Sequence, residues 1–173
     1  MALLRNLLVA VCIAFATGAA AETPLTDFNG EWRGTGQDRD SPLQTLQDTV
    51  CQNTVRATLR RMRTEMTCER KSGVRKRVRL MVDLAGDQFN GTITQRTMRD
   101  GREDAVISGT IAGKKTDNTA NFTVTWKGAT PSTSVALKLN TPTSYTMKVT
   151  ALGLSMMDLT FNRTAERAPP RPR

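Results

Sequence analysis

A two-residue alternation of apolar and polar side chains runs from Val74 to Phe161 and constrains the fold more than any other feature of the chain. The apolar residues of each segment share one parity, and the residues between them are mostly Arg, Lys, Thr, Asn, Ser and Gln. Because the side chains of a β-strand point alternately to opposite faces, this pattern predicts strands with one apolar face and one hydrated face. The apolar sets are Val74, Val78, Leu80, Val82 and Leu84; Phe89, Gly91 and Ile93; Ala105, Ile107 and Ile111; Ala120, Phe122, Val124 and Trp126; Val135, Leu137 and Leu139; Tyr145, Met147 and Val149; and Met157, Leu159 and Phe161.

Short turn signals separate these segments, and Asp100-Gly101 is the strongest because it suits a tight hairpin with positive φ at its centre. A first strand is expected at about residues 28–36 and a hairpin at about 47–68. The later strands are expected to begin near Val74, Gln88, Glu103, Asn118, Thr133, Ser144 and Met156. Short strands joined by short turns predict an all-β fold, an antiparallel up-and-down β-barrel of roughly 8–10 strands, since closure removes exposed sheet edges.

The first 21 residues have the composition of a cleaved secretory signal. Arg5 is their only charged residue, an apolar core runs from Leu7 to Phe15, and the segment ends in three alanines. A membrane anchor is the alternative, but it needs about 20 apolar residues and this run is shorter. We therefore expect cleavage before Glu22, a periplasmic or secreted protein, and no transmembrane span in its mature form. The expected domains are a signal peptide (1–21), one β-barrel (22–164) and a flexible tail rich in Pro and Arg (165–173).

Cys51 and Cys68 are the two cysteines that remain once the signal segment is removed. In an oxidising compartment we expect them to form a disulfide worth about 3 kcal/mol, with two free buried thiols as the alternative. If they face each other across a hairpin, the tip falls near residues 59–60 and Arg56 lies opposite Arg63. Like charges in that position destabilise a sheet, so these side chains must either splay into water or meet an anion.

Positive charge is concentrated in one segment of the chain. The formal net charge is +9, and loss of Arg5 with the signal leaves +8. Between residues 56 and 79 ten basic residues accompany only two acidic ones, an excess of eight. Within the strand that follows Val74, Arg75, Arg77 and Arg79 share the outward parity. The candidate anion-binding residues are Arg56, Arg63, Arg75, Arg77 and Arg79.

A concentrated basic face attracts polyanions. For an exported protein these would be lipopolysaccharide, anionic lipid head groups, an acidic polysaccharide or an acidic protein. Nucleic acid is a poor partner, because the protein is expected to be exported and the patch lacks interleaved aromatic residues for base stacking. A solvated face with no partner is the alternative interpretation.

The segment Phe28-Asn29-Gly30-Glu31-Trp32-Arg33-Gly34 contains a G-x-W motif that resembles the start of lipocalins and of the wider calycin superfamily. In those barrels the tryptophan closes one end and a basic residue near the end of the last strand packs across its ring. The resemblance implies that Trp32 and Arg163 form this barrel-closing pair. The chain departs from typical lipocalins in its cysteine placement and in lacking a long helix. It also resembles small exported proteobacterial barrels of unassigned activity and single-disulfide bacterial inhibitors of metalloproteases.

Catalysis is not expected. The chain has no histidine, both mature cysteines are expected to be oxidised, and no Gly-rich phosphate loop leads from a strand into a helix. Met62 and Met66 are too far apart along a strand to bind one copper ion, so neither a metal nor another cofactor is expected. The predicted interior of Val, Ile, Leu, Met and Ala can either fill a small barrel or line a narrow apolar site.

These observations predict a non-catalytic exported binding protein whose basic face, residues 56–79, engages an anionic envelope component. One alternative is a carrier of a small apolar ligand held inside the barrel. Another is a partner that acts through its loops, either like a protease inhibitor or in an assembly.

Overall fold

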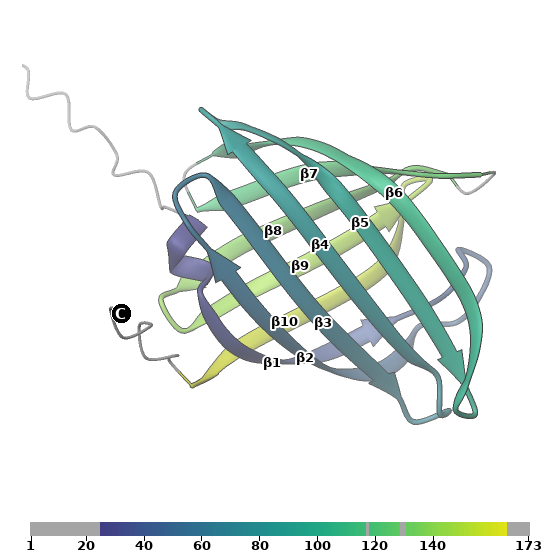
Figure 1. Ribbon diagram of the computed structural model, residues 1–173. Coiled ribbons are helices and arrows are strands. Elements are labelled where there is room, and N and C mark those ends of the chain that lie inside the picture. Colours follow the sequence, from purple (N-terminus) through teal and green to yellow (C-terminus); the bar gives the residue numbers. More distant parts are fainter. Residues whose placement is uncertain (1–24, 117, 129–130, 166–173) are drawn as a thin grey trace, which may run out of the picture.

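A computed structural model describes residues 25–116, 118–128 and 131–165, and in this part of the chain ten antiparallel strands form one closed barrel (Figure 1). Each strand pairs with its neighbours in sequence, and the first pairs with the last. The predicted all-β, up-and-down barrel is therefore confirmed, with a strand count at the upper end of the expected range. The expected signal segment and all but the first residue of the expected tail lie outside the described residues.

The elements follow one another with short connections. They are the 3-10 helix η1 (Leu25–Phe28) and the strands β1 (Gly30–Asp38), β2 (Gln47–Ala57), β3 (Arg61–Arg70), β4 (Arg75–Ala85), β5 (Gln88–Arg99), β6 (Arg102–Thr116), β7 (Thr119–Trp126), β8 (Thr133–Thr141), β9 (Ser144–Ala151) and β10 (Leu154–Ala165). The longest connection between described strands is the β1–β2 loop, residues 39–46.

Two strand boundaries differ from those expected. The first strand begins at Gly30 rather than near Phe28, because residues 25–28 form a 3-10 turn that buries Leu25 and Phe28 against the barrel. The last strand begins at Leu154 rather than near Met156. Its hairpin turn is tighter than expected, since Leu152 and Gly153 both adopt positive φ and reverse the chain in two residues.

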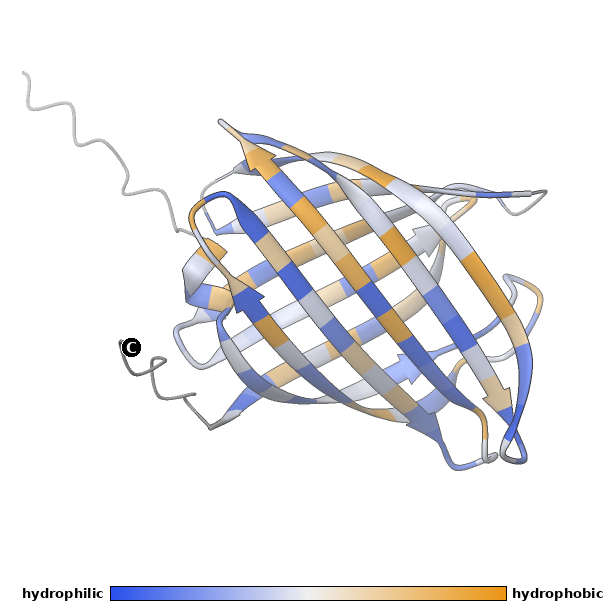
Figure 2. Cartoon of the chain, viewed as in Figure 1, coloured by the Kyte–Doolittle hydropathy of each residue, from blue (hydrophilic) through white to orange (hydrophobic). Residues whose placement is uncertain are grey.

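The alternation of side chains along the strands divides the barrel into an apolar interior and a polar exterior, as predicted. Val82, Val124 and Leu159 are among the most deeply buried residues, and Val78 packs against the same core. Apolar and polar residues alternate along single strands in Figure 2, most clearly along β4. A register slip of one residue would turn each apolar set outward, so the pattern fixes the strand pairing as well as the strands.

An aromatic cluster closes the end of the barrel where η1 lies (Figure 1). The Tyr145 ring stacks on Phe161 with centroids 4.6 Å apart, and it meets the Trp32 ring edge-on at 4.8 Å. Gly34 leaves space for Phe161, since a Cβ there would lie 2.5 Å from the ring. The Arg163 guanidinium lies 4.6 Å from the Trp32 ring centroid, which is the contact that the lipocalin resemblance implies. We call this the closed end, and the end that carries the β1–β2 loop the mouth.

Candidate ligand-binding cavity

The barrel encloses a cavity of about 610 Å³ that extends from the aromatic cluster to the mouth. Small-molecule sites in proteins have volumes of roughly 300–1,000 Å³. An eight-stranded barrel has an interior that side chains just fill, and a ten-stranded barrel is wider. The volume inside this barrel is therefore not completely filled by side chains, and it opens at the mouth. The apolar part of its wall includes Val55, Met62, Met66, Val78, Leu80, Ile93, Ile107, Phe122, Val124, Trp126, Val135, Leu137, Met147 and Val149.

Near the closed end the cavity has a small polar floor made by Asn53, Thr64 and Tyr145. The Asn53 amide nitrogen donates to the Tyr145 hydroxyl at 2.8 Å, and the Thr64 hydroxyl donates to the Asn53 amide oxygen at 2.5 Å. Burial raises the pKa of Tyr145, and the hydrogen bond from Asn53 only partly opposes this effect. The floor is therefore hydrogen-bonding but uncharged.

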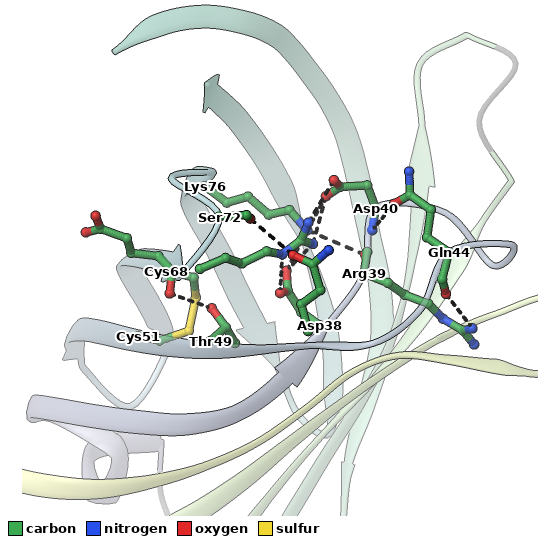
Figure 3. A network of polar contacts seen from close by, with 12 residues as sticks. Asp38, Arg39, Asp40, Gln44, Thr49, Cys51, Cys68, Ser72 and Lys76 are labelled. Atoms are coloured by element: carbon green, nitrogen blue, oxygen red, sulfur yellow. Dashed lines mark hydrogen bonds and ion pairs between the residues drawn. A yellow bond between two sulfur atoms is a disulfide. The ribbon is translucent and has the colours of Figure 1, made fainter. Parts of the chain in front are cut away.

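Four charged side chains form a compact ion cluster on one side of the mouth. Asp38 ends β1, Asp40 lies in the β1–β2 loop, Arg70 ends β3 and Lys76 lies near the start of β4. Arg70 donates to both oxygens of Asp38, at 2.5 and 2.7 Å, and to both oxygens of Asp40, at 2.8 and 2.9 Å. The Lys76 ammonium lies 2.6 Å from Asp38 and 2.7 Å from Asp40. Figure 3 shows Asp38, Asp40 and Lys76 converging beneath the loop.

Burial makes the internal pairing of this cluster essential. The side chains of Asp38 and Arg70 are only 1 % and 4 % exposed, and that of Lys76 is 8 % exposed. Partial burial pushes the pKa of Asp40 upward, but hydrogen bonds and attraction from Arg70 and Lys76 outweigh it and leave that pKa below its usual value. For Arg70, burial acts to lower the pKa, and the two carboxylates overcome this and raise it. Each charge is thus neutralised and hydrogen-bonded, which is what a buried ionic group requires.

The cluster corrects one sequence-based expectation. Arg70 and Lys76 contribute to the basic excess of residues 56–79, but both side chains are buried and paired with acids, so they add nothing to the basic outer face. A signal for this was present in the sequence. Lys76 shares its parity with the inward-facing Val78 and Leu80 of the same strand.

Arg39 and Arg99 are the other cations that line the mouth. Arg39 lies just after β1 and ties the β1–β2 loop to β10, donating to the backbone carbonyl oxygens of Ser155 at 2.6 Å, Pro42 at 2.9 Å and Gln44 at 3.2 Å. Arg99 ends β5 and lies 3.7 Å from Asp104 of β6, and both of these side chains are more than half exposed.

The predicted disulfide between Cys51 and Cys68 is confirmed and joins β2 to β3 inside the barrel wall, beside the ion cluster (Figure 3). The pairing register is the one deduced from the cysteines, with Arg56 opposite Arg63. The turn of this hairpin lies at residues 58–60, around the predicted tip. The disulfide holds together β2 and β3, the two strands whose residues Asn53 and Thr64 form part of the cavity floor.

The five candidate anion-binding arginines all lie on the outer surface of β2, β3 and β4. Arg75 is 3.2 Å from Glu69, and Arg77 and Arg79 are 3.7 and 3.3 Å from Glu65. The row is therefore partly neutralised by the two acids of the neighbouring strand. Arg56 and Arg63 lie on the same face, farther toward the closed end.

Comparisons with known proteins identify no relative: no family model matches the chain, and no curated protein has a matching sequence. Among the described residues, no three or more His, Cys, Asp or Glu side chains are grouped so that they could hold a metal ion. The same residues include no helix that is long and apolar enough to cross a membrane.

Proposed function

We propose that this protein is a non-catalytic binding protein that carries a small, mostly apolar molecule inside its barrel. The cavity of about 610 Å³, which opens at the mouth, is the observation that carries this proposal. It favours the carrier over the outer basic face, because an unfilled apolar volume forfeits packing that larger inward-facing side chains would supply.

The wall and the floor suit an amphipathic molecule. Burial of apolar ligand surface is favourable by about 25 cal/mol per Å². Met62, Met66 and Met147 line the cavity, and their flexible side chains can adapt to an irregular ligand. Asn53 and Tyr145 offer hydrogen bonds that would orient one end of it.

We also propose a lipocalin-like relationship and an exported location, periplasmic or secreted. The packing of Arg163 on the Trp32 ring, at the end that η1 covers, supports the first. The bridge between Cys51 and Cys68, together with the signal-like composition of residues 1–21, supports the second.

The basic outer face is a second candidate site, for an anionic component of the cell envelope. Its five arginines outnumber Glu65 and Glu69, which pair with three of them, Arg75, Arg77 and Arg79. Simultaneous reversal of Arg75, Arg77 and Arg79 to Glu should abolish salt-sensitive binding to vesicles that contain anionic lipid. Binding that is unaffected by both salt and the reversal would dismiss this candidate.

The carrier proposal is tested by filling the cavity from within. Val124 is fully buried and lines the cavity, and Thr125 is its exposed neighbour on β7. We expect Val124→Trp to weaken binding of N-phenyl-1-naphthylamine, an uncharged fluorescent dye, by about tenfold or more, and Thr125→Trp to leave it unchanged. Val149→Phe is a milder second plug at a partly buried position of the wall.

Circular dichroism and the urea midpoint establish that each variant is folded before its affinity is compared. Failure of the unaltered protein to bind the dye, or equal affinity in the folded plugged variants, would overturn the carrier proposal.

A further inference from the structure

All charged residues that line the cavity lie at its mouth. They are Arg39, Asp40, Lys76, Arg99 and Asp104, and they come from the β1–β2 loop and from the mouth ends of β4, β5 and β6. Within the described part of the chain, the rest of the cavity wall carries no ionisable acid or base other than the tyrosine of the floor. The site thus has a charged opening, an apolar middle and an uncharged hydrogen-bonding end.

The charged residues of the cavity lining and of the ion cluster do not balance one another. Asp38 and Asp40 balance Arg70 and Lys76 within the ion cluster. Asp104 lies beside Arg99. The cavity lining and the ion cluster together contain four cations, Arg39, Arg70, Lys76 and Arg99, and three carboxylates, Asp38, Asp40 and Asp104. This set of residues therefore carries one net positive charge.

Among the described residues, Arg39 is the cation of this set that has no carboxylate partner. Its hydrogen bonds in the described structure all go to backbone carbonyl oxygens, which orient the guanidinium but do not neutralise it. Arg99 is held only by a long contact to an exposed acid, so its side chain can turn toward a ligand. Both groups line the opening through which a ligand would enter.

The floor would not accept a charge. Asn53, Thr64 and Tyr145 are neutral, and they lie at the buried end of an apolar cavity. An ion placed there would lose its hydration without gaining a counter-charge. At the mouth an ionic group keeps part of its water and meets arginine side chains.

We infer that the natural ligand is an amphipathic monoanion, with its apolar body inside the barrel and its anionic group at the mouth between Arg39 and Arg99. This inference rests on the proposed carrier function and adds the charge and the orientation of the ligand. If the mouth charges served only to hold the β1–β2 loop in place, a neutral ligand of the same length would bind equally well.

A series of twelve-carbon probes separates these cases. Dodecanoate, dodecanol and dodecylamine carry negative, zero and positive charge at neutral pH, and each is measured by its displacement of the uncharged dye below its micelle concentration. We expect dodecanoate to bind about tenfold tighter than dodecanol, and dodecylamine to bind most weakly, because charge-assisted hydrogen bonds to arginine strengthen binding.

Two substitutions locate the effect. Arg99→Gln should remove most of the preference for dodecanoate over dodecanol, because Arg99 lines the mouth and its one described ion pair is the long contact to Asp104. Arg96→Gln is the matched control: Arg96 lies on the same strand, is exposed and pairs with Glu103 on the outer surface. It should leave the preference intact.

The possible failures are distinct. Equal affinity for the carboxylate and the alcohol would overturn the charge assignment and leave the carrier function standing. If Arg99→Gln still prefers dodecanoate to dodecanol, the placement of the anionic group beside Arg99 is overturned. Absence of binding by any probe would overturn the carrier function itself.

Discussion

Asp38 shows at the level of one residue how the mouth of the barrel is held together. Its side chain is 1 % exposed and accepts hydrogen bonds from Arg70 and Lys76. The same chain presents ion pairs on its outer surface, such as Lys148 with Asp158, whose side chains are 63 % and 51 % exposed. When a buried ion pair loses one partner, the remaining charge is left uncompensated. In an exposed ion pair, water takes the place of the lost partner.

We therefore expect Asp38→Asn to lower the free energy of unfolding by about 3–5 kcal/mol, because two cations would then share only Asp40. Asp158→Asn should change it by about 1 kcal/mol or less. Urea titration of both variants measures this difference. Similar small effects of the two substitutions would show that water reaches the ion cluster freely.

Tyr145 allows a pH test at a single residue, since it is the only tyrosine in the chain. Burial raises the pKa of its hydroxyl above the ordinary value of 10.0. The unfolded chain therefore ionises first, so the contribution of Tyr145 to stability is complete below pH 10.0 and is lost as the pH rises beyond it.

In an alkaline titration, the absorbance of tyrosinate should therefore rise only when the protein unfolds cooperatively, and not around pH 10.0 while it is still folded. Tyr145→Phe should reduce the alkaline loss of stability. Ionisation around pH 10.0 in a protein that stays folded would mean that the floor of the cavity is open to solvent.

At the level of elements, the β2–β3 hairpin was the most predictable part of the molecule. One cysteine pair and a two-residue period were enough to give its register and the position of its turn. Element η1 could not be predicted, because a single 3-10 turn has no repeating sequence pattern. The burial of Leu25 and Phe28 becomes visible only in the folded barrel, against which they pack. The ion cluster was missed for a different reason, since the parity argument was applied to Arg75, Arg77 and Arg79 but not to Lys76 or Arg70.

The disulfide is expected to stabilise this hairpin mainly by restricting the unfolded chain. Replacement of both Cys51 and Cys68 by Ala should lower the free energy of unfolding by about 3 kcal/mol. The same urea titration measures it, with the unaltered protein in its reduced state as the comparison. No change in stability would mean that the bridge is not formed in solution.

For the molecule as a whole, the sequence predicts a closed barrel with an apolar inside but not whether that inside is full. Alternation decides which side chains point inward, whereas the remaining volume depends on strand number and on how the inward side chains meet. Val124 and Val149 were identified as inward-facing residues, but their place on the wall of a cavity emerges only from the closed sheet. The same holds for Arg39 and Arg99, which lie 60 positions apart in the sequence and both line the mouth.

The central claim is that the barrel carries a small molecule, and native mass spectrometry tests it most directly. The protein is purified without detergent from its own host, and its mass is recorded folded and then unfolded. We expect the folded protein to carry an added mass of a few hundred daltons that is lost on unfolding and displaced by the uncharged dye. A folded protein with the bare polypeptide mass that also fails to take up the dye would contradict the claim.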